Sequence, residues 1–239
     1  MQGCVVIAAE PLPPTFEALE YNINLHKEWC VRQNIACANI IALNVGVGDE
    51  QALPHQNFTL YPEAAGWGTL TSLEASEEQI MSDMDAFIDN ALDGSVENAL
   101  NPIQRSLGKA LRRTTPTLYR TVARQYVKRM LSNKQITQCP MQTISDIIDE
   151  YVLPPQQQQQ LHGIELLKID VERAEVQVLQ GILTQRHWDC IDQLSMEVHE
   201  ENLPQIYALV KDRGGFQNIT TTQTPDLART SIHMVYCIK

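Results

Sequence analysis

The chain has 239 residues, of which 44% are hydrophobic and 20% are charged, a balance that is ordinary for a globular protein. This length suits one sizeable α/β domain and leaves little room for two. The formal net charge of −11 argues against general nucleic-acid binding, and no apolar run approaches the roughly 20 residues that a membrane-spanning helix needs.

The first part of the chain is predicted to alternate between strands and a helix. Cys4–Ala9 is short and β-branched, without polar alternation, which is typical of a strand buried on both faces in a parallel sheet. After a proline-rich turn, the apolar spacing over residues 16–29 predicts a helix. Ala36–Val47 is predicted to be a second strand and Asn57–Tyr61 a third.

Residues 76–134 are predicted to be a helical insertion of about three helices, because strand-like runs disappear there and helical spacing dominates. The first helix is acidic, whereas the stretch from Arg105 to Lys134 holds nine basic residues and no Asp or Glu. This basic stretch fits three arrangements. It could be a solvated helix against the acidic one, a lid over an anionic substrate, or a helix at a membrane surface.

The α/β alternation returns after a short helix at Thr143–Tyr151 and a polar loop rich in proline and glutamine. Such alternation predicts βαβ units and a largely parallel sheet that closes with an antiparallel pair. The predicted elements are a strand at Ile164–Ile169, a helix at Ala174–Leu183, a strand at Ile191–Val198, a helix at Leu203–Lys211, and a final pair at Phe216–Thr220 and Ile232–Ile238.

The most informative segment is Ile164–Ile182, with the sequence IELLKIDVERAEVQVLQGI. In it a buried strand runs into an acidic cluster, Asp170, Glu172 and Glu175, at the start of a helix. Ligands of open α/β sheets bind at the carboxyl ends of the strands, so Asp170 and Glu172 are candidate catalytic residues. The alternative is electrostatic, since carboxylates at a helix N-terminus also stabilise the helix.

Taken in order, these segments resemble the FkbM-type methyltransferases, which use S-adenosylmethionine. Ile164–Ile182 is similar to that family's LLKIDVEGAE…L.G signature, and Val6–Asn24 (VIAAEPLPPTFEALEYNIN) to its V.AFEP.P..F..L..N…N segment. The shorter matches are collinear with these two and leave only the helical insertion unmatched. They are Ala42–Asp49 (ALNVGVGD), Thr143–Tyr151 (TISDIIDEY), Met196–His199 (MEVH) and Gly215–Phe216.

The resemblance implies an α/β fold of the class I methyltransferase type, which is Rossmann-like. We expect a single domain over residues 1–239, with the helical insertion at about 76–134. Two departures from the family pattern stand out. Arg173 occupies a position where the family has glycine. The resemblance also begins at the family's second strand, so we expect the chain to be N-terminally truncated, without the first strand and its D.GAN.G cofactor loop.

The resemblance also implies a cofactor-binding role for three residues. Glu10, at the end of the first predicted strand, would accept hydrogen bonds from both ribose hydroxyls of the cofactor. Asp49 would meet the adenine amine, with Gly48 beside it in the same turn. A solvated strand end is the alternative for Glu10, and a turn-forming aspartate is the alternative for Asp49.

Two further catalytic candidates, Glu197 and His199, lie on one strand at a spacing of two, so their side chains share a face. With Asp170 they could form an acid–base or metal-binding cluster. A hydroxyl acceptor must lose its proton as it attacks the methyl sulfonium, and a histidine or aspartate within about 3 Å can take that proton. The alternatives are a satisfied buried carboxylate and a capping histidine. Trp67, between two glycines, is either a wall of the substrate pocket or a packed loop residue.

The six cysteines are scattered, with no CxxC pair and no zinc-like spacing with histidine (Cys4, Cys30, Cys37, Cys139, Cys190 and Cys237). We therefore expect reduced, mostly buried thiols, no metal site and a cytoplasmic location.

The function implied by the resemblance is O-methylation of a hydroxyl on a small molecule, sugar or polyketide-like substrate, with S-adenosylmethionine as cofactor. The expected partner is this hydroxyl acceptor, without nucleic acid; the basic insertion leaves contact with a membrane open. The alternative is a non-catalytic remnant or interaction module that keeps the sheet and has lost cofactor binding.

Overall fold

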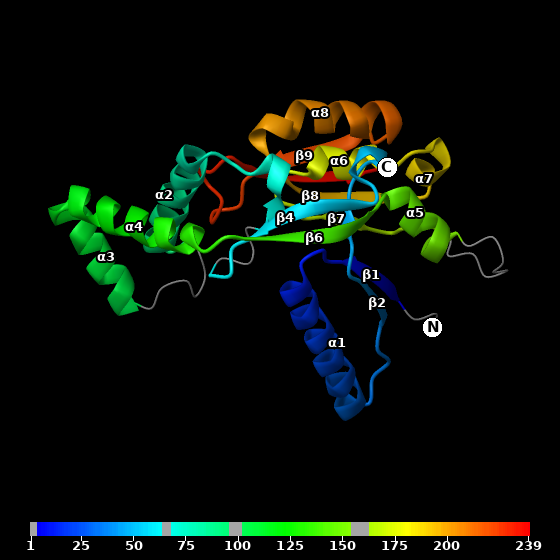
Figure 1. Cartoon of the computed structure of the whole chain (residues 1–239), viewed down its shortest axis with the longest axis horizontal. Coiled ribbons are helices and arrows are strands. Elements are labelled where there is room, and N and C mark those ends of the chain that lie inside the picture. Colours follow the sequence, from blue (N-terminus) through cyan, green and yellow to red (C-terminus); the bar gives the residue numbers. More distant parts are fainter. Residues whose placement is uncertain (1–3, 64–67, 96–101, 154–162) are drawn as a thin grey trace.

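The computed structural model describes residues 4–63, 68–95, 102–153 and 163–239. Trp67 and the loop of prolines and glutamines after Leu153 lie outside the described residues. Figure 1 shows a central body of strands flanked by α5, α6, α7 and α8, with α2, α3 and α4 grouped at one end and α1, β1 and β2 projecting from one side.

The described strands share the short lengths common in α/β proteins. They are β1 (Val5–Ala9), β2 (Asn39–Leu43), β3 (Gly46–Val47), β4 (His55–Leu60), β5 (Thr69–Leu70), β6 (Gln135–Gln142), β7 (Leu167–Ile169), β8 (Gln193–His199), β9 (Asn218–Thr222) and β10 (Ile232–Ile238).

The described helices range from one turn to several. They are α1 (Pro13–Gln33), α2 (Glu77–Asp93), α3 (Pro102–Thr114), α4 (Pro116–Ser132), α5 (Ile144–Ile147), α6 (Glu175–Gln180), α7 (Gln185–Asp189) and α8 (Leu203–Ala208). Two of them are extended by π-helical turns, α5 through Ile148–Val152 and α8 through Leu209–Arg213.

The strands form three groups rather than the largely parallel sheet that the sequence predicts. β1 and β2 are parallel, β7-β8-β10-β9 form a mixed sheet, and β3-β6-β4-β5 form another. The predicted antiparallel pair at the C-terminus is confirmed, because β10 runs antiparallel to both β9 and β8. The chain is therefore α/β, as predicted, but with mixed sheets.

Two predictions about strands are wrong. The predicted strand Ala36–Val47 is two strands in different sheets, because β2 pairs with β1 while β3 pairs with β6. β6 was not predicted at all. Half of the residues in its sequence, QITQCPMQ, are polar, and it contains Pro140. It is a strand because residues 135–140 pair with β4 and residues 141–142 pair with β3.

Three helices, α2, α3 and α4, form the described part of the predicted helical segment 76–134, and charged side chains pair between them. Arg112 on α3 reaches Asp89 and Asp93 on α2 at 3.1 and 3.0 Å, and Arg124 on α4 reaches Asp85 on α2 at 3.0 Å. The basic stretch thus lies against the acidic helix, which is the first of the three arrangements considered from the sequence.

The main hydrophobic core lies around β8 and β10. Buried side chains from α5, α6, α7, α8 and these two strands pack together there, among them Leu179, Trp188, Met196 and Val235. A second, smaller cluster joins Leu12, at the start of α1, to Phe58 on β4, Met141 on β6 and Ala174 before α6. Leu12 thereby attaches the projecting α1–β1–β2 unit to the central body.

The prediction that β1 is buried on both faces is wrong. Val5 and Val6 are 36% and 40% exposed. In the described part of the chain β1 pairs only with β2, and β7 pairs only with β8. Each of these strands therefore presents one edge of backbone donors and acceptors that no ladder satisfies.

The prediction of six reduced thiols is also wrong, because Cys30 and Cys37 form a disulfide. The last turn of α1 places Cys30 there, and Asn34 then reverses the chain in the left-handed conformation, with φ of 54°. This reversal returns Cys37 to the helix end. The remaining cysteines are free: Cys139 and Cys237 are buried, Cys190 is partly buried and Cys4 is exposed.

Among the described helices, none combines the length and the apolar character that crossing a membrane requires.

The open edge of β1 should be visible in hydrogen exchange. The Glu10 amide donates to the Leu43 carbonyl, and alternate residues of a parallel strand bond to the same neighbour, so the amides of Ile7 and Ala9 point away from β2. We expect these two amides to exchange much faster than that of Met196 in the centre of β8. Residue-resolved exchange by NMR measures this, and equal protection of Ile7 and Met196 would contradict it.

Candidate functional site

The candidate site forms where β7 and β8 end. These strands are parallel neighbours in register, with Ile169 beside Met196, so their carboxyl ends meet at one edge of the sheet. Asp170 and Glu172 follow β7, and His199 is the last residue of β8. The structure thus brings together the residues that the sequence analysis selected from two distant segments.

The buried carboxylate of Glu175 orients His199. Glu175 is fully buried, and its Oε1 lies 2.7 Å from Nδ1 of His199. It also accepts hydrogen bonds from the Arg173 amide and from the side-chain amide of Asn202. Because a carboxylate with these donors acts as an acceptor, we assign the proton of a neutral His199 to Nδ1, which leaves Nε2 free to accept one.

Nε2 of His199 faces Glu172, whose Oε2 lies 3.6 Å away. The pKa of Glu172 is raised from 4.5 to about 7. Burial is the largest cause, the charge of His199 opposes it, and the charges of Glu197, Glu175 and Asp170 add to it. At neutral pH this carboxyl group can therefore either hold or accept a proton, as a general acid or base requires.

The pKa of His199 is also raised. Burial alone would lower it, but the hydrogen bond and charge of Glu175, together with the charge of Glu172, outweigh that effect. A proton taken up at Nε2 would therefore be stabilised by carboxylates on both sides of the ring.

Glu197 and Asp170 complete the cluster in different ways. Burial and the charge of Asp170 raise the pKa of Glu197, which lies two residues before His199 on β8. Asp170 is more open, with about half of its side chain exposed, and it pairs with Lys168 on its own strand. Both lie beside the Glu172–His199 pair, as predicted; whether either one takes part in a reaction stays a prediction.

The backbone at Arg173 explains why the resembling family has glycine there. Arg173 adopts φ of 68°, in the left-handed region that glycine enters without steric cost. Its side chain pairs with Glu201 and lies close to the surface of the cluster. On the preceding residue, the carbonyl of Glu172 accepts a hydrogen bond from the Thr69 hydroxyl at 2.6 Å. These contacts hold the turn despite its strained φ angle.

Glu10 lies at the carboxyl end of β1, and its contact with a cofactor stays a prediction. Its Oε1 accepts a hydrogen bond from the Leu12 amide at 2.9 Å, and its carbonyl accepts one from the side chain of Asn44. Burial raises the pKa of Glu10, against the lowering effect of the Leu12 hydrogen bond. Oε2 has no hydrogen-bond partner within the described ranges, so it can accept one from a ligand.

Asp49 and Gly48 have structural roles in the observed fold. Asp49 caps the 3-10 turn Glu50–Ala52 by accepting hydrogen bonds from the amides of Gln51 and Ala52. The backbone of Gly48 packs against Gly181: a Cβ added at Gly181 would lie 2.2 Å from the carbonyl oxygen of Gly48. These contacts match the turn-forming alternative for Asp49, and contact of either residue with a cofactor stays a prediction.

The Glu10 end and the His199 end are linked through the second hydrophobic cluster. Leu12, two residues after Glu10, packs in it with Ala174 and Val171, which lie on either side of the turn that carries Glu172. The carboxyl ends of β1 and β7 are thus held near one another although no ladder joins the strands.

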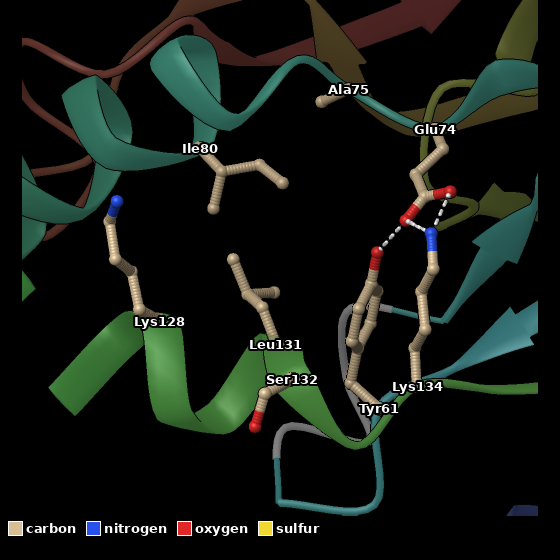
Figure 2. Close-up of a pocket in the computed structure, with 8 residues that line it drawn as sticks. All are labelled: Tyr61, Glu74, Ala75, Ile80, Lys128, Leu131, Ser132 and Lys134. Carbon is tan, nitrogen blue, oxygen red and sulfur yellow. Dashed lines mark hydrogen bonds and ion pairs between the residues drawn. The ribbon is translucent and has the colours of Figure 1, made fainter. Parts of the chain in front are cut away.

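A separate cavity of about 540 Å³ lies between α2 and α4. Figure 2 shows Glu74 there, paired with Lys134 and with the hydroxyl of Tyr61, while Ile80 and Leu131 face each other across the space. Within the described part of the chain, none of the predicted catalytic or cofactor residues lines this cavity. Its full lining is Tyr61, Glu74, Ala75, Ile80, Lys128, Leu131, Ser132 and Lys134.

Sequence reasoning missed two members of the site. Glu175 was considered only as part of an acidic helix start, although a carboxylate between the apolar positions 174 and 176 was a sign of burial. Asn202 carries no such signal, because its contact with Glu175 depends on the turn that follows β8.

Comparisons with known proteins agree with the resemblance. The family model described as the Methyltransferase FkbM domain matches residues 1–217. Methyltransferase sdnD of Sordaria araneosa is 38% identical over 76 residues, which are 31% of this chain and 29% of that protein. Methyltransferase 1 of Beauveria bassiana is 24% identical over 193 residues, or 81% of this chain and 54% of that protein. The matched parts thus span about half or less of these relatives. No solved structure matches the chain.

The raised pKa of Glu172 predicts how stability depends on pH. Between pH 4.5 and about 7 the folded chain binds more protons at Glu172 than the unfolded chain does, so its contribution to the free energy of unfolding falls as pH rises. As pH rises across this range, the free energy of unfolding should fall by about 1–3 kcal/mol less in Glu172→Gln than in the wild type. Denaturant titrations at several pH values measure the difference. The matched control is Glu165→Gln at an exposed carboxylate, and equal slopes in all three proteins would refute the assignment.

Proposed function

Because the chain belongs to the FkbM methyltransferase family, we propose that it carries the proton-accepting groups of an S-adenosylmethionine-dependent O-methyltransferase. The observation that supports this most is the chain of contacts from Glu175 through His199 to Glu172. A buried carboxylate fixes the ring of a histidine, and the free nitrogen of that ring faces a second carboxyl group of raised pKa.

In this proposal S-adenosylmethionine supplies an electrophilic methyl group on its sulfonium. His199 would accept the proton of the acceptor hydroxyl at Nε2 as that oxygen takes the methyl group, and the cofactor would leave as S-adenosylhomocysteine. Glu175 and Glu172 stabilise the imidazolium that results, since their charges lie on either side of the ring.

The residues at the end of β1 suit the ribose of this cofactor. A ribose diol offers two hydroxyl donors, and Glu10 is a half-buried carboxylate with one oxygen unengaged among the described residues. Burial from water strengthens each hydrogen bond that such a carboxylate accepts. Asp49 and Gly48 are the neighbouring positions proposed for the adenine.

The proposed acceptor is a hydroxyl on a small molecule, sugar or polyketide-like compound in the cytoplasm. The support for a small acceptor is the negative net charge of the chain, together with the pairing of Arg112 and Arg124 in the basic stretch with the acidic α2. Basic groups engaged in this way are less suited to binding nucleic acid.

Substitutions in the cluster should separate catalysis from folding. We expect His199→Gln to lower methyl transfer by a factor of about 10²–10⁴, the usual contribution of a positioned base. If Asp170 orients the acceptor, Asp170→Asn should lower turnover strongly while the melting temperature changes little. Transfer of a labelled methyl group to a panel of hydroxylated compounds measures turnover, and thermal unfolding measures stability. His55→Gln, at an exposed histidine on β4, is the control; full activity in His199→Gln would remove it from the mechanism.

The role proposed for Glu10 predicts a loss of cofactor binding. Glu10→Ala should weaken binding of S-adenosylhomocysteine by about 1–3 kcal/mol, because the ribose hydroxyls lose a buried acceptor. Isothermal titration calorimetry measures this directly, with Glu20→Ala on the exposed face of α1 as the control. Unchanged affinity in Glu10→Ala would leave Glu10 as a strand-end residue without a ligand.

A second candidate function is a non-catalytic module of the same fold. One observation favours it: in the described part of the chain β1 and β7 each have an unpaired edge, and no ladder joins the Glu10 end to the sheet that contains β7. If the wild-type chain gives no heat with S-adenosylhomocysteine while it remains folded and monomeric, this candidate replaces the enzyme for the chain by itself.

A further inference from the structure

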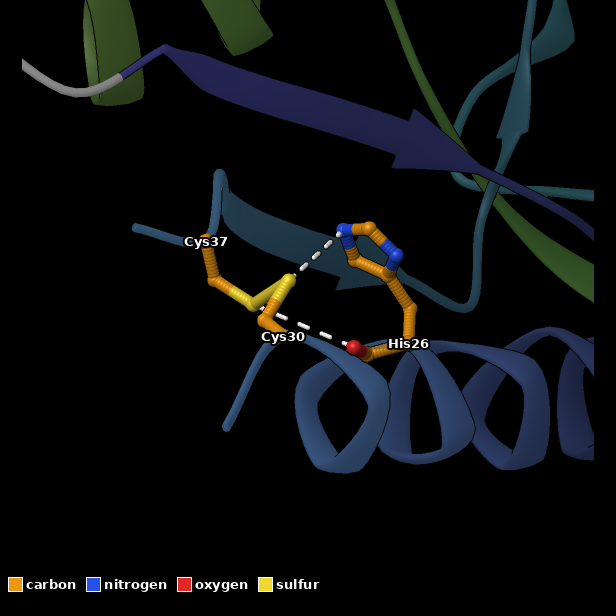
Figure 3. The surroundings of a disulfide bond; sticks show 3 residues. All are labelled: His26, Cys30 and Cys37. Atoms are coloured by element: carbon orange, nitrogen blue, oxygen red, sulfur yellow. Dashed lines mark hydrogen bonds between the residues drawn. A yellow bond between two sulfur atoms is a disulfide. The ribbon is translucent and has the colours of Figure 1, made fainter. Parts of the chain in front are cut away.

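We propose that His26, Cys30 and Cys37 form a zinc site when the Cys30–Cys37 disulfide is reduced. The imidazole of His26 and the two sulfur atoms lie within 4.8 Å of one another (Figure 3). Within the described residues, this is the one group of three histidine, cysteine or acidic side chains whose donor atoms approach so closely.

The spacing of the donor atoms fits tetrahedral zinc. With bonds of about 2.0–2.1 Å to nitrogen and 2.3 Å to sulfur, tetrahedral angles put a nitrogen and a sulfur ligand about 3.5 Å apart. Nε2 of His26 lies 3.6 Å from Sγ of Cys30. The Cα atoms of the two cysteines are 5.8 Å apart, so small side-chain rotations can bring both thiolates to one ion.

The backbone positions these donors independently of the disulfide. His26 and Cys30 are four residues apart on α1 and therefore lie on the same face of the helix. After the helix, Asn34 in the left-handed conformation donates its amide to the last carbonyls of α1 and turns the chain back, which returns Cys37. The ring of Trp29 stacks on that of His26 and restricts its orientation.

The donor set also selects the metal. Two thiolates and an imidazole suit zinc, and three protein ligands leave a fourth position for water. Cys30 is buried whereas His26 is exposed, so an ion could enter from the solvent side.

Formation of the site is a balanced exchange. A dithiol reductant passes two electrons and two protons to the disulfide, becomes a disulfide itself, and leaves two thiols on the protein. Zinc then binds as both thiols release their protons to solvent. In either state the end of α1 stays linked to the segment before β2, so in a reducing environment the metal replaces the disulfide as the cross-link.

The test uses cobalt as a spectroscopic probe and zinc as the competitor. The background protein carries Cys4→Ser and Cys190→Ser, which removes the two free cysteines that are not fully buried. After reduction by a dithiol and removal of the reductant without oxygen, we expect one cobalt ion per chain with sulfur-to-cobalt charge-transfer absorption. Stoichiometric zinc should bleach this absorption and protect two thiols from a thiol reagent, and the oxidised protein should show neither effect.

His26→Ala provides the decisive comparison, because it keeps both cysteines and changes an exposed helix position. We expect it to weaken cobalt binding at least tenfold, whereas His55→Ala, at another exposed histidine, should leave it unchanged. The proposal is overturned if the reduced protein shows no charge-transfer absorption, if the oxidised protein binds equally well, or if His26→Ala binds as tightly as the background protein.

Discussion

The arrangement of the site depends on one buried charge, the carboxylate of Glu175. A fully buried carboxylate is costly unless donors surround it, and here they come from the Arg173 backbone, from His199 and from Asn202. These donors belong to the turn after β7 and the turn after β8. Satisfying Glu175 therefore fixes both turns against each other, and the direction of the free nitrogen of His199 follows from it.

The same constraint accounts for the unusual features around it. Arg173 adopts a left-handed φ in the turn where its amide donates to Glu175, and Glu172, the residue before it, lies 3.6 Å from Nε2 of His199. Several carboxylates then share a poorly solvated edge, so they raise the pKa of one another, and His199 is the cation that offsets them. Proton affinity near neutrality is thus a property of the cluster rather than of any single side chain.

The sequence predicts the local parts of this structure well. A buried run ending in Asp170 and a spacing of two between Glu197 and His199 are enough to place those residues at one sheet edge. Features that depend on partners far away in the chain are not predicted from the sequence. The half-polar β6 becomes a strand through pairing with β3 and β4. Glu175 looks like a helix-start residue until Asn202 is placed, and Cys37 meets Cys30 because Asn34 reverses the chain. Hydrophobic periodicity and composition do not predict such pairings.

The two ends of the proposed reaction centre are coupled by packing rather than by a continuous sheet. Glu10 is held locally by the Leu12 amide and by Asn44, and Leu12 is buried against Ala174 in the second cluster. A ladder would fix the distance between β1 and β7, whereas apolar contacts through Leu12 and Ile7 leave the α1–β1–β2 unit freer to move. Whatever pairs with the open edges of β1 and β7 would therefore do more than add hydrogen bonds. It would set the distance between Glu10 and His199, the residues proposed to bind the ribose and to act as the base, and methyl transfer would depend steeply on that distance.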